Sequence, residues 1–223
     1  MTADRPVRAP GTARRGRGKS ALRENVEALA AAAVIYLFVS HFVMQAFRIP
    51  SESMCDTLLV GDYLFANKFL YGAKIPFAHR RLPAVRAPRR GDIIVFDFPV
   101  DPSKQFIKRC IATGGDTIEV RHKDVYVNGR RLVEPYVKHV DGTHEEQRGL
   151  SPRDNFGPYA VPPGCLFMMG DNRDNSLDSR FWGPVKMDLV QGPAMFTYFS
   201  TNGDQWWNAI FEIRPGRMFR PVR

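Results

Sequence analysis

The stretch Thr117–Val133, TIEVRHKDVYVNGRRLV, decides the fold class. Apolar and polar side chains alternate on either side of His122-Lys123, as they do in strands with one buried face. The dipeptide Asn128-Gly129 is a strong signal for a tight hairpin turn. We therefore expect short antiparallel strands joined by turns.

Similar apolar runs lie before and after this stretch and are bounded by Gly or Pro. They are DIIVFDF (Asp92–Phe98), QFIKRCIA (Gln105–Ala112), CLFMMGD (Cys165–Asp171) and GPAMFTYFS (Gly192–Ser200). No amphipathic stretch of helical period competes with them, so the pattern predicts a mainly β domain. Residues 134–163 are polar and rich in Pro, without a clear period, and are expected to form a surface insertion.

The composition narrows the class of protein. The 223 residues are 44% hydrophobic and 25% charged, which is ordinary for a folded chain of one sizeable domain. The net charge is +9, but there is no helix-turn-helix, zinc-finger or RNP-like pattern, so we expect no nucleic-acid partner. Three cysteines (Cys55, Cys110 and Cys165) do not make a disulfide framework, although one bridge is left open.

One segment has the length of a membrane span. Ala28–Phe47 holds 20 residues without a formal charge when His41 is neutral. As a helix it reaches roughly 30 Å, the thickness of the hydrocarbon layer. A core helix is one alternative and a cleaved secretory signal is another. However, the run exceeds the ~7–15 apolar residues of a signal peptide. A cut after Ala46 would also put the large Met44 at a position before the cleavage site that requires a small residue.

The flanks of this span predict its orientation. Residues 1–27 hold seven basic and three acidic residues, a net charge of +4, and residues 1–20 have the composition of a disordered tail. By the positive-inside rule we expect a cytoplasmic tail over 1–27, a transmembrane helix over 28–47 and an extracytoplasmic domain over 48–223.

Directly after the span comes Ile49–Leu58, IPSESMCDTL. In an extended segment Ser51 and Ser53 point to the same side, although a pair of turn or helix-cap serines is the alternative. A nucleophilic serine needs a base, and no histidine lies beside an apolar strand in a way that suggests a buried base. Lys108, inside QFIKRCI, is the candidate. Removing its charge near neutral pH requires its pKa to fall by about 3 units, or ~4 kcal/mol, through burial. The alternative is an edge-strand lysine that reaches solvent.

A polar loop, MGDNRDNSLDSRFWG (Met169–Gly183), provides a third element. A plain surface loop is the alternative, and the residue order of a calcium loop is missing. Ser176, Asp178 and Arg180 share one side at a spacing of two. We expect Ser176 to hydrogen-bond and orient the neutral amine of Lys108, and Asp178 to pair with Arg180.

In this order, four motifs resemble those of the type I signal peptidase family, the membrane-bound serine proteases that remove secretory signal peptides in bacteria. They are IPSESMCDTLLVGDYLFANKFLYG, RRGDIIVFDFP, FIKRCIATGGD and GDNRDNSLDSRFWGPV; the segment IRPGRMFRP also resembles the end of that family. The resemblance covers nearly all of residues 28–223. It implies an all-β catalytic domain of coiled antiparallel sheets after one N-terminal transmembrane helix, located in the bacterial cytoplasmic membrane.

The resemblance also implies roles for individual residues. Ser53 matches the nucleophile and Lys108 the general base, and Ser51 matches the hydroxyl that joins the Ser53 N–H in the oxyanion hole. Ser176, Arg109, Asp178 and Arg180 match supporting positions. The substrate pockets of the family correspond here to Phe47, Ile49, Pro50, Met54, Leu58, Leu64, Val95, Phe106 and Ile107. No metal or cofactor is implied.

The implied substrates are secretory preproteins cut after small residues, as in Ala-x-Ala. Membrane lipid is an expected second partner, through Trp206, Trp207 and Phe211 with the nearby Arg214 and Arg217. Glu52 and Asp56 depart from the Gly and Pro usual in the family, and Thr113–Gly115 lacks a frequent Pro. Two other functions remain as alternatives: a different Ser–Lys protease, such as a self-cleaving repressor-type domain, and an inactive membrane-anchored binding module.

Overall fold

A computed structural model of the chain divides into two units, Met1–Leu37 and Phe38–Arg223. The structure describes residues 21–75, 80–140, 152–202 and 212–223. Two expectations fall outside these ranges: the tail over residues 1–20 and the lipid contacts of Trp206, Trp207 and Phe211.

The N-terminal helix begins earlier and ends earlier than its sequence predicts. It comprises α1 (Ala21–Phe38) and a wider turn, η1 (Val39–Val43). Ala21–Val43 is long and apolar enough to cross a membrane, and no side chain of α1 is buried in the structure. The predicted end at Phe47 differs because Met44–Arg48 form strand β1, whose main chain pairs with β2 (Asp62–Asn67). Apolar residues suit both states, so hydrophobicity alone does not locate this boundary.

The larger unit is built on an eight-stranded antiparallel sheet, which confirms the mainly β prediction. Its strand order is β1-β2-β11-β3-β4-β9-β10, with β12 on the side of β11. The remaining strands of this sheet are β3 (Ile93–Asp97), β4 (Gln105–Thr113), β9 (Cys165–Met169), β10 (Val185–Lys186), β11 (Val190–Ser200) and β12 (Arg220–Pro221).

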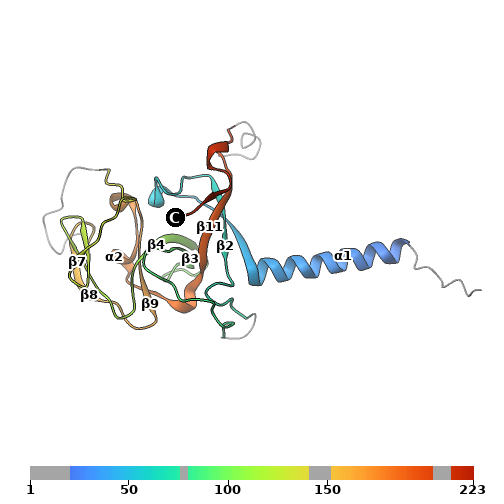
Figure 1. Ribbon diagram of the computed structural model, residues 1–223, viewed down its shortest axis with the longest axis horizontal. Helices are drawn as coiled ribbons and strands as arrows, with labels where there is room; N and C mark the ends of the chain where they lie inside the picture. The colour runs from blue at the N-terminus through green and yellow to red at the C-terminus, as the bar shows by residue number, and fades with distance from the viewer. Residues whose placement is uncertain (1–20, 76–79, 141–151, 203–211) are drawn as a thin grey trace, which may run out of the picture. The chain divides into compact units, whose positions relative to one another are not determined.

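Strand β11 joins the two halves of this sheet (Figure 1). Its first residues pair with β3, from Val190 opposite Phe96, and its last residues pair with β2, ending at Ser200 opposite Asp62. Shifts of register interrupt both pairings, and such bulges bend a strand and increase its twist. At Gly192 an added Cβ would lie 2.1 Å from the carbonyl oxygen of Asn67, so only glycine allows this approach.

The opening stretch of the sequence forms part of a second sheet, of order β7-β6-β5-β8. It contains β5 (Thr117–Arg121), β6 (Asp124–Val127), β7 (Arg130–Arg131) and β8 (Phe156–Ala160). Ile118, Val120, Val125 and Val127 are buried at the alternate positions predicted for the hairpin. The expected insertion over 134–163 differs in one respect, because β8 lies within it and pairs with β5.

Short helical turns connect the strands. They are η2 (Glu52–Met54), η3 (Arg173–Asn175), α2 (Ser179–Trp182), η4 (Met187–Leu189) and η5 (Pro215–Arg217). One apolar cluster holds the first of these turns in place, with Met54 and Leu58 packed among Ile49, Leu64 and Ile93. The three cysteines are free, with Cys110 fully buried.

Candidate active site

Ser53 lies on a short turn, and the residues before this turn are hydrogen-bonded to the β2 region. Ile49 exchanges hydrogen bonds with the β2 region, donating to Asp62 O at 2.8 Å and accepting from Gly61 N at 3.0 Å. Ser51 is extended (φ −137°, ψ 157°), and the chain then enters η2, where the Met54 side chain is fully buried. Ser53 is thereby held at 7% exposure.

Lys108 lies in the middle of β4, directly opposite Ile94 of β3, and is 4% exposed. Its Nζ donates a hydrogen bond to Ser53 Oγ and lies 5.6 Å from the centre of the Phe106 ring. Ser51 Oγ is 3.3 Å from Ser53 Oγ, on the side that the sequence predicts. The structure therefore brings together the three side chains proposed for the chemistry.

Burial changes the acid–base behaviour of Lys108. The pKa of its amine falls from 10.5 to about 8, mainly through loss of hydration; the Asp178 and Asp171 charges oppose this shift and the Arg180 charge adds to it. An amine with this pKa is partly neutral at physiological pH. It is then able to accept a proton from a hydroxyl within hydrogen-bond reach.

Two buried ion pairs brace the strands around this contact. Arg109 grips Asp171 through two hydrogen bonds of 2.8 and 2.7 Å, and its guanidinium lies 3.8 Å from the centre of the Tyr136 ring. Arg180 grips Asp178 through two bonds of 2.8 Å, as the sequence predicts. The segment is not extended, however: Asp178 caps α2 by accepting from Arg180 N.

Ser176 is a buried residue of the 169–183 loop. Its Oγ is buried but has no hydrogen-bond partner among the described residues, so the bond to Lys108 is not formed. Burial raises the pKa of the Asp178 carboxyl, yet Arg180 and the main-chain N–H of Gly170 hold it below its usual value. Gly170 allows this close packing, because a Cβ there would lie 2.3 Å from Ser176 Oγ and 2.5 Å from Ser53 O.

Asn172 is a contact that the sequence did not predict. Its main-chain N–H donates to Ser53 O at 3.1 Å, and its side-chain Nδ2 donates to Glu52 O at 3.2 Å. Both carbonyls belong to η2, so the 169–183 loop holds the serine turn directly. The density of Asn and Asp in that loop predicts turn chemistry but does not show which residue reaches another segment.

A pocket of about 270 Å³ adjoins the dyad formed by Ser53 and Lys108. Six predicted substrate-binding residues line it: Phe47, Ile49, Pro50, Val95, Phe106 and Ile107. The other three, Met54, Leu58 and Leu64, are 0–1% exposed and pack in the core beneath the serine turn instead. They shape the pocket from behind and do not line it.

Four lining residues were missed: Arg48, Gln105, Asn175 and Leu177. Arg48 and Gln105 adjoin predicted residues on β1 and β4, so their position along the chain was a usable signal. Asn175 and Leu177 flank Ser176. Leu177 is 54% exposed, and an apolar side chain so exposed beside a pocket is a signal that only the structure provides.

The known proteins that are similar to this chain share one description, signal peptidase. The family model described as "Signal peptidase, peptidase S26" matches residues 22–199. Signal peptidase I of Aquifex aeolicus is 32% identical over 268 aligned positions, covering 90% of this chain and 99% of that protein. Signal peptidase I of Pseudomonas aeruginosa is 37% identical over 171 residues, covering 69% of this chain.

The chain spans 60% of the Pseudomonas aeruginosa protein and 58% of the similar one from Pseudomonas fluorescens. A crystal structure of a signal peptidase I from Enterococcus faecalis V583 is 31% identical, with a TM-score of 0.38, and covers 48% of this chain and 97% of that one.

Proposed function

This chain belongs to the signal peptidase family, peptidase S26, and from that premise we propose that it is a serine endopeptidase that removes signal peptides from exported preproteins. The observation that carries the proposal is the buried contact between Lys108 Nζ and Ser53 Oγ. Family membership favours neither alternative left open by the sequence, a self-cleaving repressor-type protease or an inactive binding module.

In the proposed first step, the Ser53 Oγ attacks the scissile carbonyl carbon while the neutral Lys108 amine takes the hydroxyl proton. The carbonyl oxygen becomes an oxyanion that accepts hydrogen bonds from the Ser53 N–H and the Ser51 hydroxyl. When the tetrahedral intermediate collapses, the carbon–nitrogen bond breaks and Lys108 gives its proton to the leaving amine. The mature chain departs, and the signal peptide remains as an ester on Ser53.

In the second step, a water molecule attacks the ester carbonyl while Lys108 takes one of its protons. The carbon–oxygen bond to Ser53 breaks, the proton returns to Ser53 Oγ, and the signal peptide leaves as a carboxylic acid. Arg109, Asp178 and Arg180 act as supporting residues that hold β4 and the 169–183 loop. Ser176 is proposed to orient the amine once substrate fills the pocket.

The pocket beside the dyad supports a preference for small side chains before the scissile bond. Phe47, Val95 and Ile107 give it apolar walls, and its volume of about 270 Å³ lies at the small end for a ligand pocket. We propose that it receives the residues at the first and third positions before the cut, as in Ala-x-Ala. Large side chains at those positions would clash with this wall.

The N-terminal helix and the family together indicate a membrane-anchored enzyme. We further propose that residues 1–27 face the cytoplasm, that the helix crosses the bacterial cytoplasmic membrane and that the domain after it lies outside. Arg214 and Arg217, which the sequence suggests for lipid contact, bind the buried Asp62 carboxylate at 3.4 and 2.7 Å, which supports a structural contribution from both.

The test is cleavage, in trans, of a preprotein with an Ala-x-Ala site by the purified full-length chain. Ser53→Ala and Lys108→Ala should each lower kcat/KM by at least about 10³-fold, because each removes a group that acts in both steps. Ser103→Ala and Lys104→Ala are matched controls. Both residues are exposed and directly precede β4, so these variants should cleave the preprotein normally.

Both active-site variants should retain the circular dichroism spectrum of the wild type, which shows that they are folded. Normal turnover by either folded variant would remove the mechanism. Cleavage only of the enzyme's own chain, with none in trans, would favour the self-cleaving alternative.

A further inference from the structure

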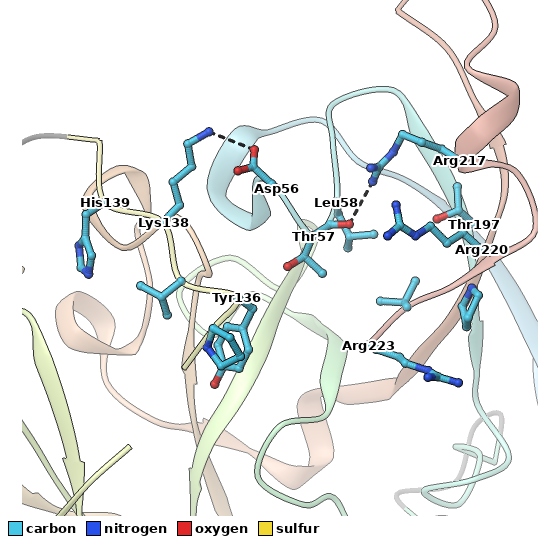
Figure 2. A pocket seen from close by; sticks show the side chains of 14 residues that line it. Asp56, Thr57, Leu58, Tyr136, Lys138, His139, Thr197, Arg217, Arg220 and Arg223 are labelled. Atoms are coloured by element: carbon cyan, nitrogen blue, oxygen red, sulfur yellow. Dashed lines mark hydrogen bonds and ion pairs between the residues drawn. The ribbon is translucent and has the colours of Figure 1, made fainter. Parts of the chain in front are cut away.

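A second pocket, of about 750 Å³, shares no lining residue with the pocket beside the dyad. It opens between the segment that follows Ser53, the segment 135–139 and the C-terminal segment 217–223, as Figure 2 shows. Nothing in the proposed cleavage mechanism uses it.

The side chains around this pocket are strongly unbalanced in charge. Four are basic, namely Lys138, Arg217, Arg220 and Arg223, whereas Asp56 is the one acidic side chain among the described lining residues. Three of the four basic residues come from the short segment 217–223. Positive charge is therefore concentrated on one wall of a concave surface, where it attracts anions most strongly.

Internal ion pairs do not remove this excess. Asp56 binds Lys138 at 3.0 Å, which neutralises one charge. Arg217 binds Asp62 at 2.7 Å, but that carboxylate is also shared with Arg214 at 3.4 Å. The side chains of Arg220 and Arg223 have no carboxylate partner among the residues that the structure describes.

The backbone directs Arg220 into the pocket. Its strand, β12, pairs with β11 so that Arg220 lies directly opposite Thr197, and paired residues of this kind project from the same face of a sheet. Figure 2 shows the Arg220 guanidinium beside Thr197 and directed toward Leu58, with Arg217 reaching the same wall from above. Arg217 is fixed there by its bond to Thr57 O at 3.0 Å.

We propose that this pocket binds a phosphate group, carried either by the headgroup of an anionic phospholipid or by a soluble phosphate. Guanidinium groups match phosphate oxygens through paired, charge-assisted hydrogen bonds. Three arginines within one short segment suit a single compact anion better than the spaced carboxylates of an extended acidic peptide. The volume also leaves room for the glycerol that a phospholipid headgroup carries.

Binding at this pocket is connected to the dyad through a short chain of contacts. Thr57 lines the pocket and donates through its Oγ1 to Asp171 Oδ2. Asp171 in turn holds Arg109, the neighbour of Lys108 on β4. An anion that pulls on Arg217 or Thr57 would therefore act on the strand that carries the proposed base.

The experiment uses the full chain in maltoside micelles, without phosphate in the buffer, and isothermal titration calorimetry. Glycerol 1-phosphate and inorganic phosphate are the soluble probes. Micelles doped with phosphatidylglycerol, compared with micelles doped with diacylglycerol, are the lipid probe, and a tetraglutamate peptide tests the acidic-peptide alternative. Arg220→Gln removes the central guanidinium, and Arg130→Gln removes the same charge from an exposed position on β7.

We expect Arg220→Gln to weaken phosphate binding about tenfold or more, and Arg130→Gln to leave it unchanged. Arg223→Gln gives a second, independent variant at the same wall. Saturation by glycerol 1-phosphate identifies a soluble ligand site, whereas a response confined to phosphatidylglycerol identifies a headgroup site. Ser53→Ala should bind phosphate normally, so failure of the proposed protease function would not affect this result.

Two outcomes would overturn the proposal. One is equal affinity of the wild type, Arg220→Gln and Arg223→Gln for every phosphate probe, including no binding by any of them. The other is binding of tetraglutamate that depends on Arg220 while all phosphate probes fail, which would assign the pocket to acidic peptides.

Discussion

Lys108 and Arg109 are neighbours on β4 and almost equally buried, at 4% and 3% exposure, yet their surroundings are opposite in kind. Arg109 faces a carboxylate that it binds through two hydrogen bonds and an aromatic ring that covers it. Lys108 faces a neutral hydroxyl and an apolar wall, and it forms no ion pair with any described residue.

The difference follows from the alternation of side chains along a strand. One face of β4 holds a cation that remains charged and ties the strand to the 169–183 loop. The other face holds a cation that is destabilised enough to lose its proton. A single strand thereby provides a structural ion pair and a titratable amine at adjacent positions.

The largest expected effect comes from exchanging each residue for methionine. Arg109→Met leaves the Asp171 carboxylate buried without its charge partner, and should lower the free energy of unfolding by about 3–5 kcal/mol. Lys108→Met removes a poorly hydrated amine, and should leave that free energy unchanged or raise it by up to about 3 kcal/mol. Urea unfolding of the detergent-solubilised chain measures both. Equal destabilisation by the two variants would contradict the comparison.

A second effect tests the hydroxyl environment of Lys108. Ser51→Ala removes one proposed oxyanion donor, and should lower kcat/KM by about 10²–10³-fold, or about 2.7–4 kcal/mol. Ser51→Thr keeps the hydroxyl and should lose less than about tenfold. Cleavage kinetics with one preprotein measure both variants. If threonine and alanine were equally inactive, the hydroxyl would not be the group that matters.

A third effect concerns pH. Because the amine of Lys108 has a pKa of about 8, its neutral fraction rises about tenfold from pH 7 to pH 9, and kcat/KM should follow. The free energy of unfolding should change with pH in the same direction as the rate. Between pH 8 and the usual lysine value of 10.5, the unfolded chain binds the extra proton, so the free energy of unfolding should rise with pH in that window. A flat rate profile from pH 7 to 9 would refute a titrating base at this position.

The smallest expected effect is that of Ser176→Ala. Its buried hydroxyl has no partner among the described residues, so its loss should not reduce stability and should lower kcat by less than about tenfold. A lowered kcat with an unchanged KM, together with a shifted rate profile in pH, would identify an orienting hydroxyl. A loss as large as that of Ser51→Ala would instead assign Ser176 a direct part in the reaction.

Much of the fold was predictable from local patterns. Thr117–Val133 formed its hairpin because a period-two pattern and an Asn-Gly turn agree with each other. The sequence did not reveal β1 or β8, because their residues suit other states equally well and only pairing with a distant strand selects the extended one. Gly170 and Gly192 show the same limit, since the atoms that require glycine belong to other segments.

The site was predictable where chemistry is carried by residue type and order. Ser51, Ser53 and Lys108 meet as the motifs imply. Met54, Leu58 and Leu64 were misplaced because an apolar residue near a pocket is equally suited to line it or to support it from below. The hydrogen bond from Asn172 to the serine turn was missed because it joins two loops that are 120 residues apart.

Strand β11 has a consequence for the timing of synthesis. Strands β1 and β2, next to Ser53, and strands β3 and β4, of which β4 carries Lys108, are bridged by β11 in one continuous sheet. Since β11 spans Val190–Ser200, a ribosome must finish most of the chain before this bridge forms. We expect the nascent polypeptide to have no hydrolytic activity until then.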